Sequence, residues 1–186
     1  MQGLEDIVCW YAMRAYKNEM RAEEVVRTIP SLECFVAKRY ELRAYHGKKV
    51  RKLVPLIPSL IFVRGTKNDI QHLKQRYQFF QYIGSALAGE RFRPLTVPDK
   101  QMSDFMKIAG EYESDVQFLS PAEVALAKGT RVKVIGGAFD GIEGVVLYDK
   151  IKNSTKVVVS LPESLGSIST AEISPELLQI VDVAEN

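Results

Sequence analysis

The stretch GTRVKVIGGAFDGIEGVV, residues 129–146, holds five glycines between two runs in which apolar and polar residues alternate. Alternation with a period of two is typical of half-buried strands. A phosphate-binding loop needs a helix after its glycines, but the strand-like segment EGVVLYD follows here, and neither GK[ST] nor GxGxxG occurs. The stretch therefore predicts a strand–loop–strand unit and excludes a nucleotide-binding loop.

The glycines of this unit have separate structural tasks. We expect three of them to supply turn dihedrals that side chains resist, and Gly144 to mark a bulge or a close backbone approach at a barrel corner. The three turn glycines are Gly136, Gly137 and Gly141. Phe139 and Ile142 are not explained in this way, because polar residues would be easier to solvate on a loop.

Composition and targeting signals bound the class of protein. With 186 residues, 46% apolar and 26% charged, the chain is an ordinary globular protein of one or two domains. Its first residues lack a signal peptide and no later stretch is apolar enough to span a bilayer, so we expect a cytoplasmic protein without a membrane contact. Cys9 and Cys34 lack CxxC spacing, which favours two small buried hydrophobes over a disulfide or a zinc site.

The charge is divided between the two halves of the chain. Residues 1–110 hold 19 lysines and arginines against 11 acidic residues, whereas residues 111–186 hold 6 against 12. A basic half of this kind can approach a polyanion, and an acidic half would repel one or attract a basic protein.

The elements predict an α+β protein with two domains and a linker. The first domain, 7–110, is expected to be an α/β sandwich with an antiparallel sheet, because strands at 9–16, 33–43, 49–65 and 79–86 and helices after Asn18, from Asn68 and at 99–109 follow in the order β-α-β-β-α-β-α. Pro55 and Pro58 cannot sit inside a central ladder, so the chain must bend or follow a sheet edge there. After an acidic linker at 111–125, five short strands predict a small five-stranded β-barrel at 126–183.

Three quoted segments carry a resemblance to a known family. KGTRVKVIGGAFDGIEGVV resembles a KOW motif, whose characteristic glycine matches Gly144. WYAMRAY at 10–16 is similar to the first strand of the NusG N-terminal (NGN) domain, and PLIPSLIFV at 55–63 is similar to its aromatic-proline-small-aromatic segment. The resemblance to the NusG family covers about residues 8–183. Within it, GGAFDGIEG and LRAYHGKKVRKLVPLIP resemble specialised, operon-directed paralogues of the RfaH kind, especially those encoded with surface-polysaccharide loci.

The resemblance implies a transcription elongation and antitermination factor that binds the clamp coiled coil of RNA polymerase and lowers pausing or termination. Matching polymerase-binding positions are Trp10, Tyr16, Ile57, Pro58, Leu60 and Phe62, and His72 lies in the segment that faces the polymerase gate loop in the family. For Trp10 and Phe62 a core position is the favoured interpretation. Ile57 and Leu60 stand where aromatics are usual, and aliphatic residues lose the ring-edge contacts that aromatics provide.

Basic residues suggest a nucleic-acid contact, with either non-template DNA or nascent RNA. Between residues 38 and 52 there are seven of them and one acid, Glu41, and like charges on one hairpin repel each other unless an anion is nearby. The seven are Lys38, Arg39, Arg43, Lys48, Lys49, Arg51 and Lys52. A solvated hairpin explains them equally well. The resemblance points to another set, near positions that touch displaced, non-template DNA in the family: Arg14, Lys17, Arg21 and Arg76.

The barrel is expected to bind a second protein. In the family its glycine loop holds a ribosomal protein or the termination factor Rho, and Phe139 and Ile142 match the apolar loop positions, with Ile142 again aliphatic. The acidic charge of this half suits a basic ribosomal protein better than RNA. RfaH can refold this domain into helices, but the Val and Ile runs here favour strand, so we expect a resident barrel.

No recognisable catalytic triad, carboxylate pair or metal-ligand spacing occurs, so we expect a monomeric non-enzyme without cofactor or metal. His46 is expected to decorate a turn. Two alternatives remain: a KOW-containing ribosomal or ribosome-assembly protein, against which the acidic barrel argues because rRNA calls for a basic surface, and an enzyme acting on nucleic acid.

Overall fold

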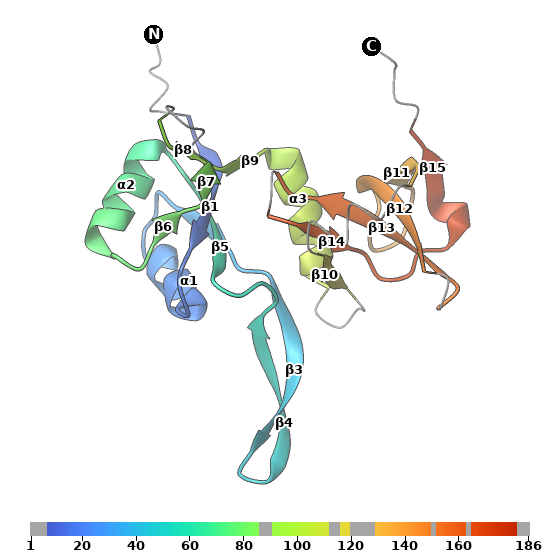
Figure 1. The fold of residues 1–186 in the computed structure, drawn as a ribbon, viewed down its shortest axis with the longest axis horizontal. Coiled ribbons are helices and arrows are strands. Elements are labelled where there is room, and N and C mark those ends of the chain that lie inside the picture. Colours follow the sequence, from blue (N-terminus) through green and yellow to red (C-terminus); the bar gives the residue numbers. More distant parts are fainter. Residues whose placement is uncertain are drawn as a thin grey trace. The chain divides into compact units, whose positions relative to one another are not determined.

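The computed structural model describes residues 7–85, 91–111, 116–119, 129–149, 152–162 and 165–181. Over these residues the protein is mixed α/β, with three α-helices and several antiparallel sheets (Figure 1). The chain divides into two compact units, Met1–Asp99 and Lys100–Asn186. Within the described ranges, no helix combines the length and the apolar character needed to cross a membrane.

The first unit is built on a sheet with the strand order β2-β5-β1-β6, in which β9 also pairs with β1. Its strands are β1 (Cys9–Arg14), β2 (Glu33–Phe35), β5 (Leu60–Gly65), β6 (Gln81–Tyr82) and β9 (Thr96–Val97). Strand β1 pairs with β5 along its whole length, from Cys9↔Gly65 to Arg14↔Leu60. Both central strands are almost continuously apolar because both of their faces are buried.

Two helices contribute to the core on one face of this sheet. Helix α1 (Glu19–Arg27) and helix α2 (Lys67–Arg76) place apolar residues at helical spacing, and these join side chains of β1 and β5 in one cluster. The cluster includes Tyr11, Met13, Ala22, Val26, Ile61, Val63, Ile70 and Leu73. The helix expected to begin at Asn68 begins one residue earlier, at Lys67, and the side chain of Thr66 caps it.

A two-stranded sheet projects from the first unit. Strands β3 (Lys38–Tyr45) and β4 (Lys48–Pro55) pair with each other over eight residues, and neither pairs with a further strand in the described residues. Figure 1 shows this hairpin extending away from the sheet that contains β1. Pro55 ends β4 and Pro58 lies in the following loop, so both prolines avoid a central ladder, as expected. A smaller pair, β7 (Gly84–Ser85) and β8 (Arg93–Pro94), also belongs to this unit.

The second unit contains an open antiparallel sheet. Its strand order is β10-β14-β13-β12-β11-β15, with α3 (Asp99–Ala109) beginning at the division between the units and a short 3-10 helix, Pro175–Leu177, before β15. The strands are β10 (Gln117–Leu119), β11 (Arg131–Val134), β12 (Glu143–Asp149), β13 (Ser154–Ser160), β14 (Ser167–Ser169) and β15 (Leu178–Ile180).

The predicted five-stranded closed barrel differs from this sheet in two ways. A sixth strand, β10, joins the edge at β14, and the two outermost strands do not pair with each other in the described residues. Closure requires ladder bonds between the first and last strands. Strand β10 lies within the segment 111–125 that was expected to be a linker. Positions 112–115 and 120–125 of that segment lie outside the described residues.

The glycine-rich stretch has the backbone that its sequence predicts. Gly136, Gly137 and Gly141 have φ values of 87°, 72° and 80°, a region that side chains resist. Gly144 has a different reason to be glycine, because a Cβ there would lie 2.4 Å from the carbonyl oxygen of Val158 on β13. The predicted close backbone approach is therefore confirmed.

Candidate nucleic-acid interface

We call β3, β4 and their turn the arm (residues 38–55). Its tip is a two-residue turn, His46-Gly47, in which both residues have positive φ, 47° and 77°. Turns of this kind match the right-handed twist of the flanking strands and favour glycine. His46 decorates the turn, as expected, and its ring meets Tyr45 edge-on at 4.3 Å between centroids. The turn sets a register in which Tyr45 faces Lys48 and Lys38 faces Pro55.

The register assigns each side chain of the arm to one of two faces. Directly paired residues of an antiparallel ladder share a face, and successive residues alternate. Face A therefore carries Tyr40, Leu42, Ala44, Lys49, Arg51 and Leu53. Face B carries Arg39, Glu41, Arg43, Tyr45, Lys48, Val50 and Lys52. Both faces have basic residues, and almost all of the arm beyond its base is exposed.

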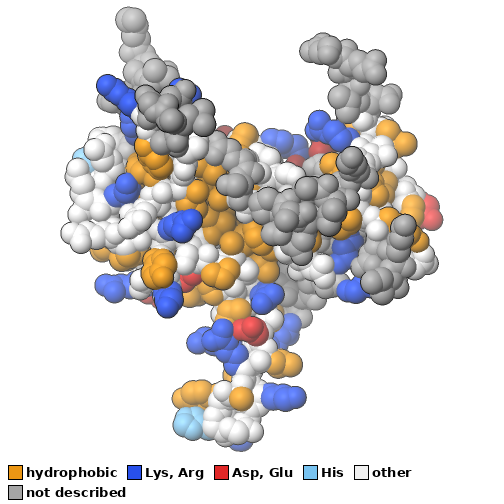
Figure 2. Space-filling model, viewed as in Figure 1, with side chains coloured by type: hydrophobic (Ala, Val, Ile, Leu, Met, Phe, Trp, Pro, Cys, Tyr) orange, Lys and Arg blue, Asp and Glu red, His pale blue; other side chains and the backbone are white. Residues whose placement is uncertain are grey.

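Some of the basic side chains of the arm have partners within the arm. On face B, Glu41 accepts a hydrogen bond from Arg43 at 2.9 Å and lies 3.9 Å from Arg39. On face A, the guanidinium of Arg51 lies 4.0 Å from the ring centre of Tyr40. A cation held over an aromatic face keeps its charge and becomes better ordered. Figure 2 shows basic side chains distributed along the arm with hydrophobic ones among them.

The base of the arm is fixed by a buried ion pair. Lys38, whose side chain is 10% exposed, donates to the Glu23 carboxylate of α1 at 2.5 Å, and Arg27 donates to the same carboxylate at 2.8 Å. Lys38 is therefore held in an ion pair and largely shielded from solvent, and we remove it from the basic residues offered to a nucleic acid. Cys34 lies beside this pair, and burial, followed by the charge of Glu23, raises the pKa of its thiol.

The sheet brings three predicted polymerase-binding residues to one end of the first unit. Because Arg14 pairs with Leu60 and the amide of Ala15 donates to the carbonyl of Ser59, the segment after β1 adjoins the loop before β5. Tyr16 is 66% exposed there, Pro58 is exposed and Ile57 is half-buried. Glu19 of α1 accepts a hydrogen bond from the Ser59 amide and so fixes this loop.

Four basic residues gather at the same end of the sheet. Strand β6 pairs with the last residues of β1, at Arg14↔Gln81, and α2 ends shortly before β6. The basic side chains of this end are exposed: Arg14, Lys17, Arg21 and Arg76. Arg21 lies 5.6 Å from the ring centre of Phe79, Arg76 lies 5.5 Å from that of Tyr77, and these two rings are in contact. Tertiary structure thus assembles the residues that the resemblance selected.

Of the remaining predicted polymerase-binding residues, three are buried and one is exposed. Trp10, Leu60 and Phe62 are buried in the sheet, which agrees with the core interpretation of Trp10 and Phe62. Leu60 is also buried, at 5% exposed, so its contact with polymerase stays a prediction and would need a rearrangement that exposes the side chain. His72 is exposed on α2.

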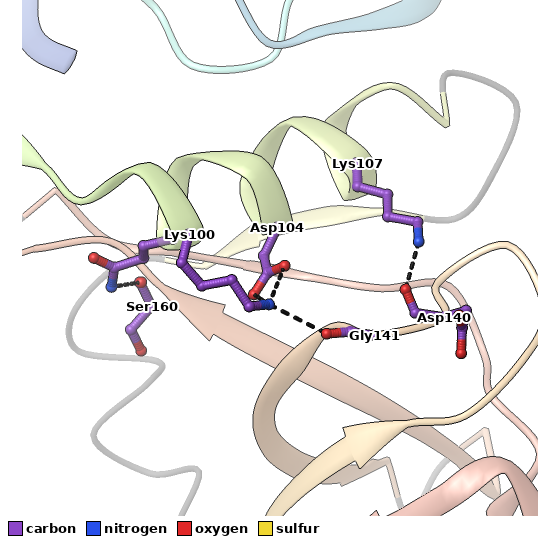
Figure 3. A network of polar contacts seen from close by, with 7 residues as sticks. Lys100, Asp104, Lys107, Asp140, Gly141 and Ser160 are labelled. Carbon is purple, nitrogen blue, oxygen red and sulfur yellow. Dashed lines mark hydrogen bonds and ion pairs between the residues drawn. The ribbon is translucent and has the colours of Figure 1, made fainter. Parts of the chain in front are cut away.

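The apolar loop residues of the second unit are also buried. Ile142 is 0% exposed and Phe139 is 7% exposed, so neither is presented to a partner in this conformation. Helix α3 contacts the same loop (Figure 3): Lys100 donates to the Gly141 carbonyl at 3.2 Å and Lys107 to the Asp140 carbonyl at 2.5 Å. The role of Phe139 and Ile142 in binding a partner therefore stays a prediction, and it would require their exposure.

Metal binding and acid–base chemistry require clusters of ionisable side chains. Over the described residues, no group of three or more His, Cys, Asp and Glu side chains is placed to hold a metal ion. The pKa of the Asp69 carboxylate is lowered, mainly because this group accepts a hydrogen bond from the Thr66 hydroxyl in the cap of α2. The lowered pKa of Asp69 is therefore explained by its role in capping the helix.

Comparison with known proteins yields no match: no protein-family model and no curated protein matches the chain. The candidate site is therefore defined by its own geometry, which consists of the arm and the basic end of the sheet.

Sequence reasoning missed the aromatic partners of the basic residues. Tyr40, Tyr77 and Phe79 contact Arg51, Arg76 and Arg21 through their rings. The alternation in residues 38–45 was the available signal for Tyr40, because a period of two places it on one face with Leu42. No local signal pairs Arg21 with Phe79, since the contact depends on how α1 packs beside the segment before β6.

Proposed function

We propose that this protein is a transcription elongation and antitermination factor of the NusG type, resembling the specialised RfaH-like paralogues. Its first unit binds RNA polymerase, contacts nucleic acid and reduces pausing or termination, and its second unit recruits another protein. In this proposal the first unit corresponds to an NGN domain and the second to a KOW domain.

One observation supports the proposal most strongly: the first unit gathers exposed and half-buried apolar side chains together with exposed cations at one end of a sheet. Tyr16, Ile57 and Pro58 supply the apolar side chains, and we call these three residues the apolar end patch. Arg14, Lys17, Arg21 and Arg76 lie at the same end. An apolar contact with a protein beside cations that meet phosphates is what a factor needs when its partner protein itself holds nucleic acid.

The sequence motifs complete the support. The KOW-like stretch has the turn glycines and the close approach at Gly144 that its pattern requires. The burial of Phe139 and Ile142 means that, in this proposal, recruitment uses either other residues of the second unit or a conformation in which α3 has moved from the loop.

Binding to a reconstituted elongation complex from the host organism tests the proposal. The variant Tyr16→Ala/Ile57→Asp removes an exposed ring and charges the apolar end patch, and we expect it to weaken binding at least tenfold, about 1.4 kcal/mol. The control is Tyr148→Ala/Ile135→Asp, which makes the same two changes at an exposed Tyr and an exposed Ile of the second unit. Thermal unfolding of all three proteins checks that each is folded.

Retention of wild-type affinity by the end-patch variant would contradict the assignment of the polymerase contact. If the wild-type protein does not bind the elongation complex and instead sediments with ribosomal particles, the proposed function fails and the ribosomal alternative replaces it.

A further inference from the structure

We propose that the arm binds duplex DNA by entering the major groove as a two-stranded ribbon. This inference rests on the proposed function for its biological setting and deepens it, because it names the form of nucleic acid that the arm contacts. Four properties of the arm support it: its exposure, the placement of its charge, its dimensions and the state of its aromatic rings.

The exposure of the arm is unusual for a structural hairpin. An isolated two-stranded sheet is marginally stable in water, and most such hairpins pack one face on a core. Here the base is buried at Ala37 and Val54 and the side chain of Lys38 is only 10% exposed, whereas Leu42, Tyr45 and Val50 are exposed towards the tip. The Lys38–Glu23 ion pair therefore anchors an arm whose outer part is exposed.

The charge of the arm is placed for contacts on two sides. Glu41 is paired with Arg39 and Arg43 on one strand, while Lys48, Lys49 and Lys52 on the other strand are exposed. Lys49 lies on face A, and Lys48 and Lys52 lie on face B. We call these three residues the arm lysines. A ribbon with cations on both faces suits a groove that has a phosphate backbone on each side.

The dimensions of the arm fit the major groove of B-form DNA. Two strands lie about 4.8 Å apart, and with side chains on both faces a ribbon is about 10 Å thick. The B-form major groove is about 12 Å wide and admits a two-stranded ribbon, whereas the major groove of A-form RNA is too narrow for side chains to enter. Eight residues per strand extend about 27 Å, so the arm can follow the groove for several base pairs.

The aromatic rings of the arm favour duplex over single-stranded nucleic acid. Proteins that bind single strands stack bases on open aromatic faces. Tyr40 is already covered on one side by Arg51, whereas Tyr45, which is 67% exposed, meets the ring of His46 edge-on. Phosphate contacts by the exposed lysines therefore dominate, and these are the contacts that a duplex offers in greatest density.

The test measures binding of the pure full-length chain to a labelled duplex of about 16 base pairs, which is roughly twice the length of the arm at about 3.4 Å per base pair. Polymerase is absent, so the result is independent of the polymerase contact. Affinity is measured at several salt concentrations for the wild type and for Lys48→Ala/Lys49→Ala/Lys52→Ala. We expect the slope of log K against log[salt] to decrease in magnitude by about 2.7, at about 0.9 for each lost phosphate contact.

A control variant with the same change in charge isolates the arm. Lys67→Ala/Arg131→Ala/Lys133→Ala removes three exposed cations elsewhere, and it should keep the wild-type slope. Equal slopes for the arm variant and this control would overturn the proposal. Equal or tighter binding of an A-form RNA duplex or of single-stranded DNA, compared with duplex DNA, would also overturn it.

Dimethyl sulfate probing locates the groove, because guanine N7 lies in the major groove and adenine N3 in the minor groove. At saturation, the wild-type protein should protect N7 and leave N3 reactive, and the arm variant should lose the N7 protection. Protection of N3 instead would overturn major-groove entry. A protein that binds DNA in this way and fails to bind the elongation complex would disprove the proposed function while leaving the arm assignment intact.

Discussion

Thr66 and Asp69 show how two side chains fix the start of a helix. Thr66 accepts a hydrogen bond from the Asp69 amide at 3.1 Å, and the Asp69 carboxylate accepts from both the amide and the hydroxyl of Thr66. This reciprocal capping box satisfies donors that α2 cannot satisfy itself. The hydroxyl contact is also the main reason that the pKa of Asp69 is lowered.

Thr66→Ala should lower the free energy of unfolding by about 1 kcal/mol at neutral pH, because it removes the cap. A lowered folded-state pKa gives stability that is present above the unfolded value, about 3.9, and is lost as pH falls through the folded value. The difference between wild type and variant should therefore narrow in acid. Urea unfolding at several pH values checks this, and a difference that stays constant down to acid pH would contradict it.

Gly144→Ala should destabilise the protein by about 1–3 kcal/mol, because the added Cβ would lie 2.4 Å from the Val158 carbonyl oxygen and 2.7 Å from a methyl group of Val157. Gly141→Asn is the matched comparison. Gly141 has positive φ but open space around it, and Asn tolerates that backbone. Denaturant midpoints should fall clearly for Gly144→Ala and little for Gly141→Asn, and the reverse order would refute the packing explanation.

At the residue scale, the backbone was more predictable than the exposure of side chains. Glycine spacing in 136–144 indicated both the turn dihedrals and the close approach, because those needs are local or nearly so. The burial of Phe139 and Ile142 was not predictable, since it depends on packing by segments distant in the sequence. The same holds for Leu60, which follows an exposed proline-containing loop and yet enters the core.

At the scale of elements, the arm and α1 are joined by a charge pair rather than by apolar packing alone. Replacing Glu23 by Gln should cost about 3 kcal/mol, because it leaves the ammonium of Lys38 buried without its partner. The double variant Glu23→Leu/Lys38→Met should be close to wild type, because apolar residues of similar volume often replace a buried pair at little cost. Chemical denaturation of both variants measures their free energies of unfolding. A double variant that is less stable than the single variant would contradict this expectation.

Periodicity predicted most helices and strands. The observed ends differ from the predicted ones where tertiary contacts set the length of an element. The helix at 99–109 and the strand at 143–149 coincide with α3 and β12, because apolar spacing and turn glycines mark them strongly. The long strand expected at 49–65 is divided into β4 and β5 by the two prolines. Strand β10 was missed because QFL is too short to show a period, and it is a strand only through its pairing with β14.

At the scale of the whole molecule, the division between the units falls at the start of α3 rather than after it. The sequence placed this helix in the first domain, but most of it groups with the second unit. Besides the two lysine contacts with the glycine loop, Gln101 donates to the Ser160 carbonyl (Figure 3). Sequence order alone could not show this, because a helix at a boundary has the same amphipathic pattern on either side of it.

A fragment that begins before Lys100 should therefore be more stable than one that begins at Glu111. We expect the helix-containing fragment to unfold cooperatively at a higher temperature, because it keeps the hydrogen bonds of α3 to the loop carbonyls. Circular dichroism during heating measures this. Identical transitions for the two fragments would show that α3 does not stabilise the second unit.

The ladder of the arm also constrains how its reach can change. Because side chains alternate between faces, inserting one residue into each strand would exchange faces A and B beyond the insertion, and inserting two into each would preserve them. Each face-preserving insertion lengthens the hairpin by about 7 Å. The length of the arm can therefore change during evolution in fixed steps, while its base, held by Lys38 and Glu23, stays the same.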